Sequence, residues 1–132
     1  MSIQTVVDLQ SVVRERGSHA YIVTVTEDGA PHAVYVPVRW DGGELVAEVG
    51  ARTAANAKAR ARVSLLYAVR AEDDYSLIVD GAAVVEPGEG GARVRVTPSK
   101  VVLHRPGPAP DPTSSCGADC VPLPLPGRPG PR

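Results

Sequence analysis

The sequence has no phenylalanine, no excess of basic residues and no long apolar run. Its 132 residues include one tryptophan and two cysteines, and the formal net charge is −1. This charge argues against a nucleic-acid partner, because binding to a phosphate backbone usually needs a clear basic excess. No stretch approaches the ~18 consecutive apolar residues of a membrane-spanning helix. We therefore expect neither nucleic acid nor a membrane as a partner.

The N-terminus has no basic segment followed by an apolar block, the pattern of a secretory signal. The expected location is therefore cytoplasmic, where Cys116 and Cys120 would be reduced thiols. Their spacing is not the redox Cys-x-x-Cys pattern, and two thiolates do not complete a four-ligand zinc site. Shared metal binding between subunits, or a dithiol cycle, remains the alternative to a plain pair of thiols. His19, His32 and His104 share no metal-ligand spacing, so no metal site is predicted.

Composition divides the chain into two parts. Residues 106–132 are crowded with proline and glycine and have few large apolar side chains. Such a segment buries too little apolar surface to offset its chain entropy, so we predict a disordered tail. Residues 1–105 then form one domain of ordinary size. Its apolar residues are mostly valine, alanine and leucine, and a valine-rich core favours β-strands.

The periodicity of apolar residues predicts two short helices and a set of antiparallel strands. Apolar residues from Val6 to Val13 lie at helical spacing before the stop at Gly17. An alanine-rich run at residues 52–61 predicts a second helix, with Thr53 as its N-cap. Asp-Gly turns separate strands of period two, and Asp80-Gly81 inside a strand predicts a bulge. The predicted strands cover about residues 19–26, 32–39, 45–49, 62–69, 75–86 and 93–103.

These elements predict an all-β-dominated fold with two short helices. About six antiparallel strands would form a closed or nearly closed barrel, because closure removes the exposed edges of a valine-rich sheet.

Five strings of residues also occur in a characteristic order along this predicted barrel. Their order and spacing resemble the split-barrel family that includes pyridoxamine 5′-phosphate oxidase and the related flavin- and deazaflavin-dependent reductases. The strings are residues 23–32, Tyr35-Val36-Pro37-Val38, residues 51–56, residues 62–66 and residues 75–81.

The resemblance implies a split β-barrel that forms a homodimer, with FMN or a deazaflavin in a groove between the subunits. It places the cofactor phosphate near the start of the second helix and the ring against the second strand. Many family members carry a lysine in that helix, where this chain has Ala55 or Asn56. The candidate cofactor-binding residues are therefore Val36, Pro37, Val38, Arg52, Thr53 and Asn56.

Part of this site can also be argued from the residues alone. A helix N-terminus stabilises an anion, and Arg52 could bind phosphate oxygens in a bidentate manner beside the Thr53 hydroxyl. The alternative is that Thr53 only caps the helix and Arg52 is solvated. Pro37 removes a donor from its strand, which places it at an edge or a bulge. A bulge would let Val36 and Val38 contact a planar ring. The alternative is an ordinary edge strand, which accounts for Pro37 without any bound ring.

No protein-based catalytic motif is recognisable. The glycine-rich run at residues 88–91 precedes a strand pattern, whereas a dinucleotide fingerprint opens a helix. A protein acid–base pair is also missing, which suits a protein whose cofactor carries the hydride chemistry. The leading hypothesis is an FMN- or deazaflavin-dependent oxidoreductase acting on a small organic substrate. The alternatives are a non-catalytic flavin carrier, and a haem-binding barrel with a histidine ligand.

Overall fold

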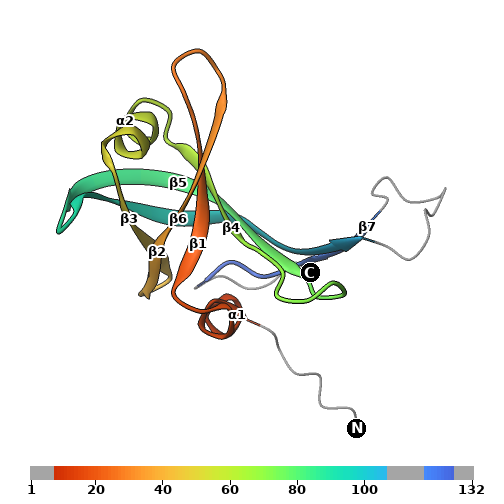
Figure 1. Ribbon diagram of the computed structural model, residues 1–132. Coiled ribbons are helices and arrows are strands. Elements are labelled where there is room, and N and C mark those ends of the chain that lie inside the picture. Colours follow the sequence, from red (N-terminus) through yellow and green to blue (C-terminus); the bar gives the residue numbers. More distant parts are fainter. Residues whose placement is uncertain (1–7, 107–117, 127–132) are drawn as a thin grey trace, which may run out of the picture.

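The computed structural model describes residues 8–106 and 118–126. They form two helices and seven strands (Figure 1). The elements in chain order are α1 (Leu9–Arg16), β1 (His19–Val25), β2 (Pro31–Asp41), β3 (Glu44–Val49), α2 (Ala51–Ala59), β4 (Arg62–Tyr67), β5 (Ser76–Gly88), β6 (Gly91–Pro106) and β7 (Ala118–Pro122).

Six of the strands close into a barrel. Neighbouring strands pair in the order β3-β2-β1-β4-β5-β6, and β3 then pairs with β6. Every pairing is antiparallel. The predicted all-β fold, a barrel with two short helices, is therefore confirmed.

The barrel splits where β3 leaves β2. β3 pairs with β2 only as far as Ala47, opposite Val38, but continues along β6 to Val49. The Val38 N–H donates to the Ser18 carbonyl at 2.8 Å, on the β1 side. Backbone N–H groups point alternately towards the two neighbouring strands, so an N–H at position 37 would point to the side that β3 has left. Pro37, which has no N–H, thus lies where β2 has become an edge, as predicted.

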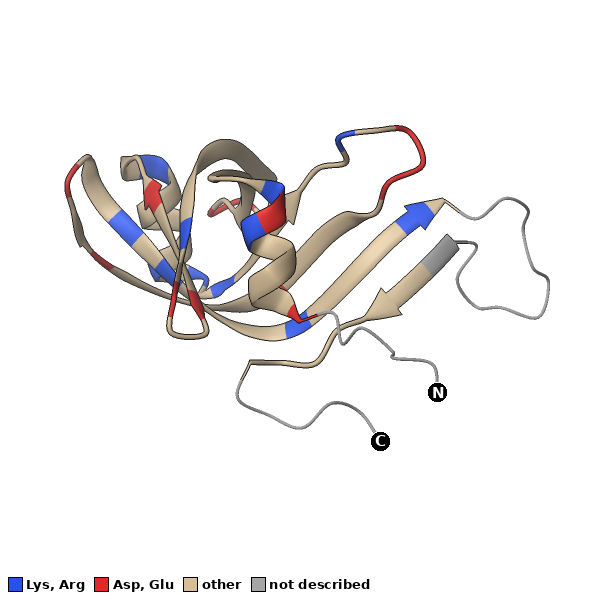
Figure 2. Cartoon of the chain, turned by 90° about the horizontal axis from the view of Figure 1, so that it is seen from below, with Lys and Arg blue, Asp and Glu red and all other residues tan. Residues whose placement is uncertain are grey.

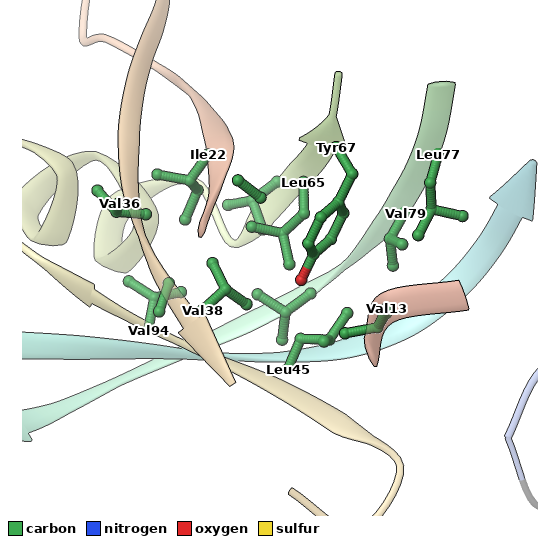
Figure 3. Close-up of a cluster of buried hydrophobic side chains, with 14 of the residues drawn as sticks. Val13, Ile22, Val36, Val38, Leu45, Leu65, Tyr67, Leu77, Val79 and Val94 are labelled. Carbon is green, nitrogen blue, oxygen red and sulfur yellow. The ribbon is translucent and has the colours of Figure 1, made fainter. Parts of the chain in front are cut away.

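The barrel interior is filled with aliphatic side chains (Figure 3). Each Val or Leu that is fully buried contributes roughly 1.5–3 kcal/mol relative to exposure. Tyr67 brings a hydroxyl into this interior, and within the described residues that hydroxyl has no hydrogen-bond partner. Burial raises the pKa of the Tyr67 phenol, so the side chain stays neutral. Residues with no more than 1 % exposure include Ile22, Leu45, Leu65, Tyr67, Leu77, Val79 and Val94.

The two helices lie towards opposite ends of the barrel (Figure 1). α1 starts where the Asp8 carboxylate accepts a hydrogen bond from the Ser11 N–H at 2.8 Å, and it ends at Gly17 with φ of 97°. Its apolar face, Leu9, Val12 and Val13, is buried in the core.

Charges of both signs are interspersed over the strands (Figure 2). Arg95 on β6 pairs with Asp41 at 2.8 Å, Glu86 at 3.2 Å and Glu44 at 3.4 Å. The hydrogen bond from Arg95 holds the pKa of Asp41 below its ordinary value. These cross-strand pairs lie where β3, β5 and β6 meet, but exposed pairs add little stability.

Residues 118–126 differ from the predicted tail. β7 pairs with β6 from Val102 opposite Pro122 to Pro106 opposite Ala118. Beyond β7, the Leu123 N–H donates to the Val101 carbonyl at 2.9 Å, and its side chain is 7 % exposed within the core cluster. The sequence prediction relied on the high proline content and overlooked Leu123 and Leu125. These leucines bury apolar surface although the prolines between them have no backbone N–H to donate to a sheet. Residues 107–117 and 127–132 lie outside the described residues, so for them the tail stays a prediction.

The bulge predicted at Asp80-Gly81 is present as a register shift between β5 and β6. A Cβ on Gly81 would lie 2.7 Å from Val96 Cγ1 and would collide with the Thr97 backbone oxygen. The bulge therefore brings two backbones too close for any side chain.

We predict that Gly81→Ala lowers the free energy of unfolding by about 2 kcal/mol, because the backbone must shift to admit the methyl group. Urea unfolding measures the change. Gly90→Ala is the matched control, because a Cβ there meets nothing within 4 Å. Equal stability of the two variants would contradict the proposed close approach.

Candidate cofactor site

An open cleft lies between the β1–β2 turn and α2. It has a volume of about 630 Å³ and is lined by Thr26, Glu27, Asp28, Arg52 and Asn56. This volume falls within the ~300–1,000 Å³ of small-molecule sites. Two of the predicted residues, Arg52 and Asn56, therefore line one cleft. The turn residues were predicted only as a turn, because the sequence does not show which element a turn faces.

The start of α2 presents unpaired backbone donors at this cleft. The helix begins at Ala51 after Gly50, which makes no side-chain capping bond, and the first turn has no acidic residue. The Ala54 N–H makes the first backbone bond back to Gly50, at 3.0 Å. The N–H groups of residues 51–53 precede that bond, as expected at a helix start. Such an uncapped N-terminus favours an anion.

Thr53 does not cap the helix as predicted. It lies inside the first turn of α2 and is only 3 % exposed. The prediction failed because Gly50, which follows β3 in an extended conformation, is the N-cap and lets the helix start earlier than the threonine preference suggested. A hydroxyl buried in this way does not face the cleft.

Asn56 fastens α2 to β1. Its side-chain amide donates to the Thr24 hydroxyl at 3.1 Å, and both residues are buried. At the end of the helix, the Arg60 Nε donates to the Val25 carbonyl at 2.6 Å. These two bonds position the helix beside the β1–β2 turn, so Asn56 shapes the cleft wall mainly as an anchor.

The electrostatics of the cleft are mixed. Arg52 is exposed and makes no ion pair with any described residue. On the opposite wall, a hydrogen bond from the Thr26 hydroxyl holds the pKa of Asp28 below its ordinary value. Asp28 therefore carries its charge at neutral pH beside Glu27. An anion bound here would be attracted from the α2 side and repelled from the turn.

The structure separates the predicted strand residues from this cleft. The side chains of Val36 and Val38 point into the core, with 7 % and 5 % exposure (Figure 3). Pro37, between them, is exposed on the outer surface. Alternation along β2 forces this arrangement, because the barrel interior takes every second residue. The predicted contact between a ring and the side chains of Val36 and Val38 therefore does not fit. Pro37 remains the candidate on this strand.

Exposed aromatic residues lie on the same outer face as Pro37. Tyr35 is 62 % exposed, stacks on His19 at 5.3 Å between ring centres, and lies 5.0 Å from the ring of Tyr21. We call these three residues the aromatic patch. Sequence reasoning did not bring these three residues together, because His19 and Tyr21 come from β1 and meet Tyr35 only through the β1–β2 register.

A second cleft of about 630 Å³ lies on the outer face of β1, β4, β5 and β6. Arg62 and Lys100 line it together with Asp80, whose carboxylate accepts a hydrogen bond from Ser64 at 2.5 Å. No helix starts at this cleft. Of these two clefts, only the α2 cleft combines an arginine with a helix N-terminus.

Of the two cysteines, Cys116 lies outside the described residues. Cys120 is exposed on β7 and stands opposite His104 on β6. Across residues 8–106 and 118–126, no three metal-ligating side chains converge.

Two mycobacterial proteins are related to this chain in sequence, although no family profile matches it. They are the uncharacterized proteins Mb0449c of Mycobacterium bovis and MT0457 of Mycobacterium tuberculosis. Each is 35% identical over 122 residues, which covers 81% of this chain and 86% of the relative. This chain belongs to the same family as these two proteins.

Several solved structures share the fold of this chain. A Clostridium acetobutylicum protein of the pyridoxinephosphate oxidase family has a TM-score of 0.60 at 12% identity, covering 72% of this chain and 84% of that one. An F420 reductase has a TM-score of 0.58 at 19% identity, covering 73% and 98%. The Vibrio cholerae haem storage protein HutZ has a TM-score of 0.56 at 16% identity, covering 70% and 92%.

The chain has the split-barrel fold of these solved structures. The fold predicted from the ordered strings of the sequence is thereby confirmed. At these low identities the similarity establishes architecture, while the cofactor and the reaction must be argued from the residues of the cleft. Among the described residues of this split barrel, no helix is long and apolar enough to cross a membrane.

We predict that Thr24→Val lowers the free energy of unfolding by about 1–3 kcal/mol, because it leaves the Asn56 amide buried without its acceptor. Urea unfolding provides the measurement. The double variant Thr24→Val/Asn56→Leu is the control, since it removes both partners and should lose less than the sum of the single changes. Strict additivity would show that the two side chains are not coupled.

Proposed function

We propose that this split barrel binds a flavin-type cofactor, FMN or a deazaflavin, with the cofactor phosphate at the start of α2. Bound there, the cofactor would exchange hydride with a small organic substrate. The observation that carries the proposal is the exposed guanidinium of Arg52, which pairs with no described residue, beside an uncapped helix N-terminus in a cleft of ligand size.

The residues of the cleft fit the phosphate end of such a cofactor. The Arg52 guanidinium can form a bidentate pair with phosphate oxygens, and the N–H groups at the start of α2 can donate to a further oxygen. The cofactor would supply the hydride chemistry, and the chain would supply position and electrostatics. Glu27 and Asp28 would weaken phosphate binding, so we expect a moderate affinity.

The solved structures support the class of cofactor. An F420 reductase and a protein of the pyridoxinephosphate oxidase family share the fold. HutZ shares it as well, and that protein is a haem storage protein. A non-catalytic carrier of flavin or haem is therefore the second candidate. The exposed His19 of the aromatic patch favours it, because an accessible imidazole could serve as a haem ligand.

We further propose that two copies form a homodimer and that the cofactor lies at their interface. The aromatic patch supports this arrangement, because large aromatic side chains left on a sheet face are typical of interfaces. Pro37 lies on the same face, at the edge where β3 leaves β2. A partner subunit covering this face would enclose the ring end of the cofactor. It would supply the contacts that Val36 and Val38 do not make, because their side chains point into the core.

We expect Arg52→Ala to weaken binding of FMN, or of the deazaflavin, by about tenfold or more, because a charge-assisted pair is lost. Titration of each cofactor, followed by its fluorescence, gives the affinity, and added haem is followed by its Soret absorption. The free energy of unfolding in urea should be unchanged, because Arg52 is exposed and has no ion pair within residues 8–106 and 118–126. Unaltered affinity would show that the phosphate does not bind at α2.

The matched control removes a charge of the opposite sign from the same cleft. Glu27→Gln should tighten FMN binding by about two- to tenfold, because it removes repulsion without adding a contact. Weaker binding after this change would mean that Glu27 contacts the cofactor directly, against our assignment.

We expect Tyr35→Glu to shift the protein from dimer to monomer by at least about tenfold in dissociation constant, since it places a charge within the proposed interface. Light scattering across a dilution series measures this shift. Val69→Glu is the control, because Val69 is 45 % exposed but lies in the β4–β5 connection. A monomeric unaltered protein would contradict the dimer proposal while leaving the Arg52 assignment intact.

A further inference from the structure

Trp40 stands in a groove at the end of the barrel that carries α1. Three adjoining cavities of about 320, 490 and 680 Å³ surround it, and Trp40 and Gln10 line all three. The walls come from α1, from the β2–β3 turn and from residues 124–126. We call this feature the Trp40 groove.

The chain places its own proline-rich segment in this groove. Residues 122–126 read Pro-Leu-Pro-Leu-Pro. Leu123 is buried in the core cluster, Leu125 packs against that cluster, and Pro124 and Pro126 line the cavities beside Trp40. Pro126 also lies against Gly43 of the β2–β3 turn, where an added Cβ would be 3.3 Å from the proline Cβ.

The contact is apolar and does not complete the barrel. Pro124 and Pro126 have no N–H to donate, and Leu123 makes its backbone bond to β6 before the groove begins. The six-strand barrel closes through β3 and β6 without β7. Residues 118–126 therefore add to an already closed barrel, as a ligand does.

We propose that the Trp40 groove is a recognition site for proline-rich peptide segments and that residues 122–126 of the same chain are its occupant. Prolines hold the backbone near an extended conformation, so docking costs little conformational entropy, and aromatic-lined grooves are the usual partners of such segments. Attachment to β6 gives the segment a high effective concentration, which keeps the site filled. Cavities remain around Trp40 beside this segment, so the groove is larger than the segment that occupies it.

The test uses the full chain and its single tryptophan, Trp40. Leu123→Ser/Leu125→Ser should release the segment, so that Trp40 emission moves to longer wavelength and acrylamide quenching increases about twofold or more. A synthetic peptide of residues 118–126 should then reverse both changes in a saturable manner. The same peptide with serine at both leucine positions should have no effect, and neither peptide should alter the unaltered chain.

Val121→Ser is the matched control, because Val121 lies in the same segment but is 38 % exposed. Its Trp40 emission should equal that of the unaltered chain. If the double variant loses cooperative unfolding, or if the peptide fails to reverse its emission, the segment is a fixed part of the core and the proposal is wrong. Emission that changes with protein concentration in the Tyr35→Glu variant, whose proposed dimer interface is disrupted, would identify a second copy as the occupant and would overturn the assignment to the same chain.

Hydrogen exchange of the unaltered chain gives a second measurement. The Leu123 N–H, bonded to Val101, should exchange at least about tenfold faster than the Ala83 N–H, bonded to Ala61 in the barrel, because a docked segment opens without global unfolding. Equal exchange rates would place both amides in one cooperative unit and overturn the proposal.

Discussion

The pairing between β3 and β6 is the constraint on which the rest of the structure depends. β3 is the last strand in the order that starts at β6, and only its return to β6 closes the barrel. To make that pairing, β3 leaves β2 beyond Ala47 and delivers Gly50 and α2 to the end of the barrel where the β1–β2 turn lies. The candidate cofactor site is thus a consequence of closure. It forms where the strand that closes the barrel turns into a helix.

The same constraint explains which parts of the site could be predicted. Period two, Asp-Gly turns and an alanine-rich run are local signals, and they predicted the strands, the Asp80-Gly81 bulge and both helices. Position 52 was also predictable, because an arginine at a helix start has a local chemical meaning. The opposite wall of the cleft, Thr26, Glu27 and Asp28, was not predictable, because these residues come close to α2 only in the folded chain.

Two errors came from neglecting the demands of the barrel interior. Val36 and Val38 were expected at the ring of a cofactor, but a small barrel takes both of them for its core and leaves Pro37 outside. Thr53 was expected at the helix cap, but the first turn of α2 packs it inward. For the two valines, burial of apolar surface, at roughly 25 cal/mol per Å², outweighed the contact expected with a ring. For Thr53, the earlier start of α2 after Gly50 decided its position. The segment at residues 118–126 was missed for a related reason, because its leucines are spaced by prolines that signal a tail.

The mixed charge of the α2 cleft bears on the choice between a catalyst and a carrier. A carrier that must hold its ligand through dilution gains from an unopposed cation. Here the Arg52 guanidinium faces Glu27 and an Asp28 whose pKa is held below its ordinary value by the hydrogen bond from Thr26. Because the lowered pKa keeps Asp28 ionised through the neutral range, its opposition to a bound anion persists there and would ease only in acid, as the Asp28 carboxylate gains a proton. We therefore expect the cleft to hold an anionic ligand less tightly than a cleft with an unopposed cation would.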